Sequence, residues 1–303
     1  MLIPGQETKE KRRHGTAYVP YSLYICRIPG DFPNVPMHWH SEFELDYVVR
    51  GQGTFTIGGE KYLAQEGDLM FLPPNRLHAA YPYEGPLQYH ALVFHPALLG
   101  AGLSDRCAVE CLRPIAAGTW RVPAYIPAQA PDAGGLREAA RTVFACALEQ
   151  LPQPDLLLRA ELLRLVWLLS IRPECAQQPD PEQDGGEAVR PALEYMMRHY
   201  REPVSIGQLA RAVHLSESYF MGTFKRAVGL SAMEYLTQLR VNAACEALAA
   251  TEQPIAEIAF SVGFGNLSNF NRQFKRSMGC TPRAFRSKAG GQGDTGGLSA
   301  AWK

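Results

Sequence analysis

The first third of the chain alternates short apolar runs with turn signals. Between residues 18 and 94, pairs such as Gly58-Gly59 and Pro73-Pro74 separate the runs at short, regular intervals. This spacing is typical of short antiparallel strands in a small barrel or sandwich. The pattern predicts an antiparallel β-barrel with an N-terminal arm for residues 1–131.

A helical pattern replaces the alternation from Asp132 onward. Apolar residues recur with a helical period over 136–148 and 156–171, so residues 132–171 are predicted to form two helices. Their apolar faces are broader than a small barrel would cover, which makes them the expected surface of a homodimer. The alternative, in which both helices simply pack on the barrel, stays open. Residues 172–187 are rich in proline, glycine and polar residues and are interpreted as a linker.

The last third of the chain contains an internal repeat. The segments Ser218-Tyr219-Phe220 and Phe224-Lys225-Arg226 recur 50 residues later as Ser268-Asn269-Phe270 and Phe274-Lys275-Arg276. In both copies two phenylalanines stand four residues apart, so they lie on one helix face and are expected to pack inward. The repeat predicts two similar helical units within residues 188–288.

Each copy is predicted to be a short helix, a tight turn and a second helix. In the first copy Ser205 and Ser216 are suited to cap the two helices, and Gly229 to end the second. In the second copy Asn266 takes the capping position. The stretch between the copies, Ala232–Ala250, is rich in leucine and alanine and would span roughly 28 Å as a helix. That length approaches the roughly 34 Å between successive major-groove faces of a duplex.

Charge is divided unevenly along the chain, although 30 basic and 30 acidic residues leave no formal net charge. Residues 187–288 hold 13 Lys and Arg against 8 Glu and no Asp. A basic surface favours a polyanionic partner, because neutralising phosphates releases counterions. The segment with the repeat is therefore expected to bind double-stranded DNA.

The apolar segments and the cysteines indicate the compartment in which the protein works. Residues 1–13 are polar and the apolar stretch 156–171 is interrupted by charges, so neither a signal peptide nor a membrane span is predicted. Seven cysteines are an odd number that suits free thiols in a reducing compartment. Cys107 and Cys111 are left as an alternative disulfide or metal pair. We expect a cytoplasmic protein with no membrane partner.

The segment from about Ala188 to Arg286 resembles the DNA-binding domain of AraC/XylS-type transcription regulators. The resemblance is carried by Ile255-Ala256-Glu257-Ile258-Ala259, Val262-Gly263-Phe264, Phe270, Phe274-Lys275, Gly279, Thr281-Pro282 and Phe285-Arg286. It implies recognition helices at about residues 216–227 and 266–278 that enter adjacent major grooves. The residues expected to contact DNA are Ser216, Ser218, Met221, Lys225, Asn266, Ser268, Asn271, Arg272 and Lys275.

The two recognition helices differ in the contacts expected of them. In the second, Arg272 is suited to read a guanine edge, and Asn271 or Ser268 to hydrogen-bond to neighbouring bases or phosphates. In the first, Met221 and Gly222 stand where members of the family often carry long polar residues. The first helix is therefore expected to contact mainly the DNA backbone.

A second resemblance, to the two motifs of the cupin barrel, is carried by His38-Trp39-His40, Glu44, Gly51, Gly67, Pro73 and His78. Alternation along a strand turns His38 and His40 to the same side. The resemblance implies that Glu44 and His78 lie beside them. The chain departs from the cupin pattern at Asn75, where a glycine is usual, and at Pro82, where an asparagine is usual.

These residues form the predicted effector site. Three imidazoles and a carboxylate, from His38, His40, Glu44 and His78, are a competent ligand set for a divalent metal such as zinc, iron, manganese or nickel. Alternatively, the same groups bind the hydroxyls of a sugar, with Trp39 stacking on its apolar face. Purely structural histidines are the third alternative. No cofactor is assigned beyond this candidate metal.

The sequence thus predicts two domains: a cupin-like barrel followed by two helices, and an all-α tandem helix-turn-helix domain. The predicted function is a ligand-responsive, sequence-specific DNA-binding transcription regulator. The resemblance favours a sugar effector, activation of carbohydrate-related genes and RNA polymerase as a partner. No phosphate loop or nucleophile motif occurs, so no enzymatic activity is expected. The alternatives are a metal-dependent cupin enzyme fused to a DNA-binding domain, and a DNA-binding scaffold whose barrel binds nothing. Residues 289–303 are expected to be a disordered tail.

Overall fold

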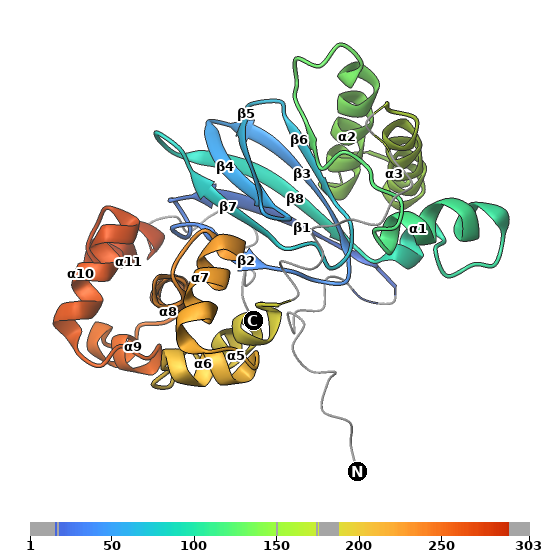
Figure 1. The fold of residues 1–303 in the computed structure, drawn as a ribbon. Helices are drawn as coiled ribbons and strands as arrows, with labels where there is room; N and C mark the ends of the chain where they lie inside the picture. The colour runs from blue at the N-terminus through green and yellow to red at the C-terminus, as the bar shows by residue number, and fades with distance from the viewer. Residues whose placement is uncertain (1–15, 17, 150, 174, 176–187, 291–303) are drawn as a thin grey trace.

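The computed structural model describes residues 16, 18–149, 151–173, 175 and 188–290 of the chain (Figure 1). Two units follow each other: an N-terminal unit of strands and helices up to residue 175, and a helical C-terminal unit, residues 188–290. The predicted N-terminal arm, most of the linker and most of the tail lie outside the described residues. The predicted class, a β-rich domain followed by an all-α domain, is confirmed.

Two antiparallel sheets face each other in the N-terminal unit. The larger sheet has the strand order β1 (Tyr21–Ile28), β8 (Leu87–Phe94), β3 (Phe43–Arg50), β6 (Leu69–Leu72) and β9 (Tyr125–Ile126). The smaller sheet has the order β2 (Val35–His38), β7 (His78–Pro82), β4 (Gln52–Ile57) and β5 (Glu60–Gln65). The space between the sheets is filled by side chains such as Ile28, Val48 and Met70.

The two sheets form a sandwich, so the cupin-like β-rich domain that the sequence predicts is not a closed barrel within the described residues. Within the described residues, the strand pairing of one sheet does not continue into the other. The edge strands supply the reason, because β9 has two residues and the register of β2 on β7 shifts between Val35 and His38. A short or irregular edge offers few aligned backbone groups to a further strand.

Two long helices, α2 (Ala133–Ala147) and α3 (Pro154–Ser170), cover the outer face of the larger sheet (Figure 1). On that face Phe43 stacks against Phe71 and Phe94, with ring centroids 5.5 Å apart in both pairs. These rings share one core with the apolar side chains of α2 and α3. Packing on the sheet, which the sequence analysis left open as an alternative, is therefore what the structure shows for one face of each helix. Shorter helical segments extend this layer: η1 (Pro96–Leu99), η2 (Ala108–Leu112) and α1 (Arg113–Ala116).

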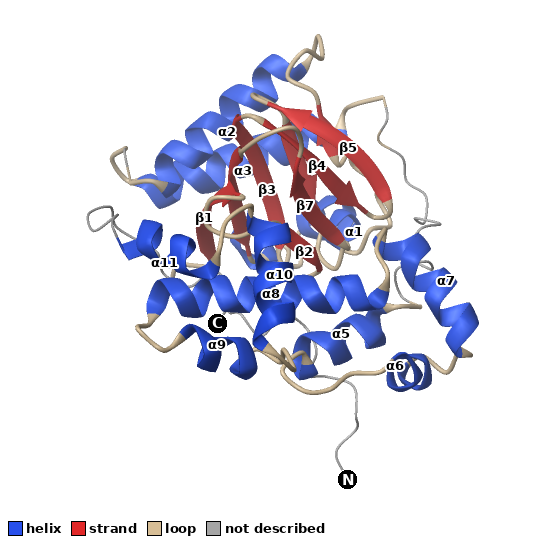
Figure 2. Ribbon diagram, turned by 90° about the vertical axis from the view of Figure 1, so that its left-hand side faces the viewer, coloured by secondary structure: helices blue, strands red, loops and turns tan. Residues whose placement is uncertain are grey.

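The C-terminal unit is built around one long helix, α8 (Ala232–Ala250). Before it come α5 (Arg190–His199), α6 (Ile206–Ala212) and α7 (Glu217–Val228), and after it α9 (Ile255–Ser261), α10 (Leu267–Met278) and α11 (Pro282–Gly290). In Figure 2 the first helix-turn-helix unit, α6–α7, lies beyond one end of α8, and the second, α9–α10, lies over its middle and its other half. The first shares its core with Tyr235 and Leu236 of α8, and the second with Val241 and Leu248.

The helix ends lie where the sequence placed them. Ser205 accepts a hydrogen bond from the backbone N–H of Gln208, and Ser216 from that of Tyr219, so both are N-caps. Asn266 caps α10 in the same way. Both second helices end at a glycine in the left-handed conformation, Gly229 at φ 80° and Gly279 at φ 70°. The duplicated local signals therefore produce duplicated structure.

The two halves of the C-terminal unit are joined at the middle of α8. The Arg240 guanidinium donates to the backbone carbonyls of Tyr200 and Glu202, at 2.7 and 2.8 Å, just after α5. The turn of the second helix-turn-helix unit packs here too, because a Cβ added at Gly263 would lie 2.5 Å from the Tyr200 carbonyl oxygen. Gly263 also has φ +95°, so only glycine fits this turn without strain.

The N-terminal and C-terminal units share an apolar core. Met37, Trp39, Leu77 and Ala79, from β2, β7 and the residues next to them, are buried with side chains of α5 to α8. The Tyr235 hydroxyl donates to the carbonyl of Met37 at 2.7 Å, and the Asn242 amide donates to the carbonyl of Asn34 at 3.0 Å. The edge of the smaller sheet is therefore docked directly on the helical unit. None of the helices in the described ranges is long and apolar enough to traverse a bilayer.

Candidate ligand site and nucleic-acid interface

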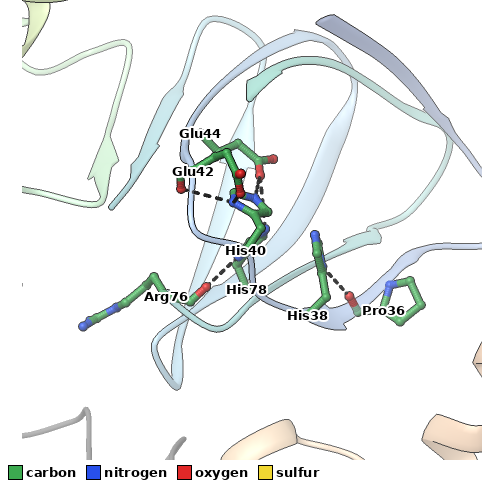
Figure 3. A network of polar contacts seen from close by, with 7 residues as sticks. All are labelled: Pro36, His38, His40, Glu42, Glu44, Arg76 and His78. Carbon is green, nitrogen blue, oxygen red and sulfur yellow. Dashed lines mark hydrogen bonds and ion pairs between the residues drawn. The ribbon is translucent and has the colours of Figure 1, made fainter. Parts of the chain in front are cut away.

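Three histidines and one glutamate meet between the two sheets (Figure 3). His38 on β2 is paired directly with His78 on β7, and His40 lies in the loop that follows β2. Glu44 reaches the same place from β3 of the larger sheet. All four side chains are buried, with residue exposures between 3 and 7%. One candidate ligand atom from each residue lies within 4.8 Å of the others. The predicted cluster is therefore brought together in space.

Backbone carbonyls orient all three imidazoles. The Nδ1 atom of His38 lies 2.9 Å from the carbonyl of Pro36, that of His40 3.1 Å from Glu42, and that of His78 2.8 Å from Arg76 (Figure 3). A carbonyl can only accept, so each Nδ1 carries a proton and donates. In a neutral ring the Nε2 atom then keeps its lone pair and can bind a metal ion. Histidines that bind metals usually donate their other ring N–H in this way.

Glu44 is the negative centre of the cluster. Its Oε2 lies 2.7 Å from Nε2 of His40 and 3.2 Å from Nε2 of His78. Burial opposes the ionised form, but the electrostatic attraction of the His78 and His40 rings and the hydrogen bond to His40 outweigh it. Together they hold the pKa of Glu44 well below its usual range. The carboxylate is therefore charged at neutral pH and requires a positive charge beside it.

The donor set fits a divalent cation. Within the described residues, Nε2 of His78 makes no well-aligned hydrogen bond, although it faces the Glu44 carboxylate. In the neutral ring this places two hydrogen-bond acceptors against each other in a buried position, which is costly unless a cation lies between them. A proton on Nε2 or a metal ion meets that need. Three imidazole nitrogens and one carboxylate oxygen are ligands that zinc, manganese, iron and nickel accept.

Asp46 adds a second buried carboxyl that the sequence interpretation missed. It lies two residues after Glu44 on β3, is 2% exposed, and its Oδ1 has no hydrogen-bond partner among the described residues. Burial, the charge of Glu44 and a hydrogen bond to Glu44 raise the pKa of Asp46 well above its usual range. A hydrogen bond between two carboxyl groups requires a proton on one of them, and the opposite directions of the two pKa shifts favour the proton on Asp46. Residues two apart on a strand lie on the same face, so the spacing Glu44-x-Asp46 could have indicated that Asp46 lies beside Glu44.

Cys26 and Tyr89 line the same interior. They are paired across β1 and β8, and their side chains hydrogen-bond to each other. Burial is the main reason that the pKa values of both groups are raised, so both are neutral. Asp46 and Glu44 are close enough to both groups to contribute to these raised pKa values, so Cys26 and Tyr89 add polar groups to the buried surroundings of the cluster.

Trp39 lies elsewhere than the sequence interpretation expected. It is 5% exposed and packs in the core shared by the two units, and the Arg190 guanidinium lies 5.4 Å from the centroid of its ring. Strand alternation explains this position, because the neighbours of His38 along the chain, Met37 and Trp39, face the opposite side of the sheet. Trp39 is therefore an interdomain residue, and the proposed stacking of Trp39 on a sugar is not supported.

The candidate DNA-reading residues lie on the outward faces of α7 and α10. Phe220 and Phe224, like Phe270 and Phe274, are fully buried. The opposite faces are exposed and carry most of the residues expected to contact DNA: Ser218, Met221, Lys225, Ser268, Asn271, Arg272 and Lys275. The Arg272 guanidinium donates to Asn269 Oδ1 at 2.9 Å, so it is already oriented along the helix. Ser216 and Asn266 are exposed N-caps. Each side-chain oxygen accepts a hydrogen bond from the backbone N–H three residues later.

Comparison with known proteins agrees with this division of the chain. A family model described as "AraC-like ligand binding domain" matches residues 22–166, and one described as "Helix-turn-helix domain" matches residues 209–288. The HTH-type transcriptional regulator YdeC of Bacillus subtilis is 23% identical over 287 residues, covering 94% of this chain and 98% of YdeC.

Two further similarities cover most of the chain. The HTH-type transcriptional activator RhaS of Pectobacterium carotovorum is 26% identical over 259 residues, covering 84% of this chain and 88% of RhaS. A crystal structure of ToxT from Vibrio cholerae covers 89% of this chain and 99% of ToxT, with 10% identity and a TM-score of 0.50, a likeness of fold alone. The chain therefore belongs to the AraC-type transcription regulators, with an N-terminal ligand-binding domain and a C-terminal helix-turn-helix DNA-binding domain.

Proposed function

We propose that the chain is a ligand-responsive regulator that binds DNA through α7 and α10 and senses its effector at His38, His40, Glu44 and His78. The observation that carries the proposal is the position of this cluster. Three of its four members lie on β2, on β7 or in the loop after β2, and the edge formed by these strands packs on the helical unit. A change at the cluster therefore acts on the strands that hold the DNA-binding domain.

The cluster is proposed to take a divalent cation, held by the Nε2 atoms of the three histidines and by the Glu44 carboxylate. A bound cation would supply a Lewis-acidic centre for oxygen atoms of a small molecule. The chain's own residues orient that centre: backbone carbonyls hold the imidazoles, and the protonated Asp46 holds Glu44. A molecule rich in hydroxyls, such as a sugar, suits both the cation and the nearby polar groups of Cys26, Tyr89 and Asp46.

Strand alternation supplies the first route from the cluster to the DNA-binding domain. His38 stands between Met37 and Trp39, and His78 stands between Leu77 and Ala79. The histidines contribute to the cluster, and the four neighbours are buried against the helical unit. A shift of either strand that accommodates a ligand must also move these apolar contacts, because the backbone is shared.

The turn between β6 and β7 supplies the second route. The backbone N–H of Asn75 donates to the carbonyl of His40 at 2.7 Å, and the carbonyl of Asn75 accepts from the Arg190 guanidinium at the start of α5. The next residue, Arg76, provides the carbonyl that orients His78. One turn thus contacts two histidines of the cluster and the first helix of the DNA-binding domain.

The outer face of α3 is proposed as the dimer surface. Leu156, Trp167 and Ile171 are 75, 57 and 59% exposed, although α3 also packs on the larger sheet through its other face. Large exposed apolar side chains along one helix are suited to a second copy of the same helix in a two-fold dimer. Activation through RNA polymerase is proposed by analogy with the relative named as a transcriptional activator.

The test uses the full-length protein and a duplex that it enriches from a random pool. Chelator-treated protein is titrated with Zn²⁺ or Mn²⁺ and a sugar panel, and affinity for the enriched duplex is measured by fluorescence anisotropy. We expect stoichiometric metal binding and a change of at least several-fold in affinity for the enriched duplex, which serves as the operator. His78→Ala should abolish both, whereas His95→Ala, an exposed histidine outside the cluster, should change neither.

Each possible failure points to a different part of the proposal. If no sequence is enriched at low salt, the DNA-binding function is wrong. If a sequence is enriched but neither metal nor sugar alters affinity or thermal stability, the sensing function is wrong. Conversion of a sugar by the metal-loaded protein would instead support the enzymatic alternative. Arg272→Ala should reduce the preference for the enriched over a scrambled duplex by about 1–3 kcal/mol.

A further inference from the structure

The internal repeat allows the two recognition helices to be compared position by position. Residues 50 apart occupy equivalent places, because α7 and α10 begin after equivalent caps and end at equivalent glycines. On the outward face α10 presents Asn269, Asn271 and Arg272, which carry amide and guanidinium groups. The equivalent residues of α7 are Tyr219, Met221 and Gly222. Two equivalent helices therefore differ in their outward side chains: those of α10 are polar and suited to hydrogen-bond to bases, and those of α7 are mainly apolar.

The apolar face of α7 is exposed in the part of the chain that the structure describes. Tyr219 is 61% exposed and Met221 is 49% exposed, although the N-terminal unit is docked nearby. A Cβ added at Gly222 would meet no atom of the described residues within 4 Å. Within the described residues, none of the chain's own elements covers this face, so its apolar side chains are not there to fill a core.

The surroundings of the face favour duplex DNA as its occupant. Lys225 and Arg226 are exposed in the last turn of α7, as their equivalents are in α10. Cations at the end of a helix are suited to phosphates that flank a groove, and the middle of the helix then lies over the base edges. In the major groove the one apolar feature of a base edge is the 5-methyl group of thymine.

We propose that α7 recognises a thymine-containing subsite, with Met221 packing on a thymine methyl group. Gly222 leaves the helix thin at that level, so the backbone approaches the groove closely. This inference rests on the proposed function and revises the expectation that α7 contacts mainly the DNA backbone. The operator then has two chemically different subsites: one read by α7 through methyl groups, and one read by α10 through hydrogen bonds.

Replacement of thymine by uracil tests the proposal. Deoxyuridine keeps every hydrogen-bonding group of thymidine and removes only the methyl group. Full-length protein first enriches a duplex from a random pool, and each thymine of that duplex is then replaced singly. We expect at least one replacement to weaken binding by about 4-fold, the value for losing contact with one methyl group. In Met221→Ala this replacement should have no effect, because the contact is already absent.

A matched variant and a stability measurement keep the result unambiguous. Asn271→Ala, at the equivalent position of α10, should bind more weakly but keep the same thymine-to-uracil effect. Met221 is exposed, so Met221→Ala should unfold at the wild-type temperature. The proposal is overturned if no thymine replacement weakens binding, or if the weakening persists in Met221→Ala. It is also overturned if Met221→Ala weakens enriched and random duplexes equally, which would indicate a backbone contact. Failure to enrich any duplex would instead refute the DNA-binding function itself.

Discussion

Replacement of Tyr235 by phenylalanine removes one hydroxyl group from the core shared by the two domains. That hydroxyl donates to the carbonyl of Met37 at 2.7 Å, and both residues are fully buried. Met37 directly precedes His38, so the hydrogen bond lies one residue from the proposed effector site. The ring of Tyr235 and its packing against Phe224 are kept in the variant.

The expected magnitude follows from the carbonyl that is left without its donor. An unsatisfied buried polar group costs about 1–3 kcal/mol, which is roughly 5- to 150-fold in the equilibrium that docks the two domains. We expect a lower free energy of unfolding. We also expect the ratio of operator affinities with and without bound metal to move toward one, because coupling between two sites is carried by the contacts that differ between states.

The assay is fluorescence anisotropy of the enriched duplex, with and without metal, together with denaturant unfolding. Tyr21→Phe is the matched control, since it removes a hydroxyl that donates to Asp155 at 2.7 Å on the α3 side of the sheet. The control should retain the wild-type ratio. The reasoning is refuted if Tyr235→Phe lowers stability but leaves the affinity ratio unchanged.

Three further outcomes are expected. The raised pKa of Asp46 means that the folded state loses stability as pH rises above the ordinary carboxyl range of about 4. Asp46→Asn should therefore raise the melting temperature at pH 7 and change it little near pH 4, which differential scanning fluorimetry can follow. Gly263→Ala should destabilise the protein by more than about 1 kcal/mol in a denaturant titration, because of its positive φ and a backbone clash. Gly265→Ala should be nearly neutral, because the added Cβ meets no atom of the described residues. Trp167→Arg should convert a dimer to a monomer in light scattering, and an unchanged mass would exclude α3 from the dimer interface.

Features encoded by neighbouring residues could be predicted from the sequence. Ser205, Ser216 and Asn266 cap helices through bonds to N–H groups three residues away, and Gly229 ends α7 through its own left-handed conformation. These interactions depend on local spacing alone. The helix ends of the tandem unit were therefore accessible without a structure.

Features that depend on which distant segments meet were harder to predict. The histidine cluster followed from a known pattern, but Trp39 within that pattern turned out to face the helical domain. Alternation predicts that Trp39 and His38 face opposite sides of the sheet. It does not reveal that the side with Trp39 is covered by the helical domain. Asp46 was missed because an acidic residue on a strand is usually solvated, and its burial depends on the packing of both sheets.

The bond pattern around Arg240 has a consequence for the promoters that this regulator can recognise. The Arg240 guanidinium, at the midpoint of α8, hydrogen-bonds to the backbone just after α5. Gly263, in the turn between α9 and α10, packs against the same backbone. The separation of the two recognition helices is therefore set by the protein and not by the duplex. Target sites can diverge by base substitution, since each substitution costs one contact. Insertion of a few base pairs between the subsites would rotate one of them out of register, so spacing should be invariant among the sites it controls.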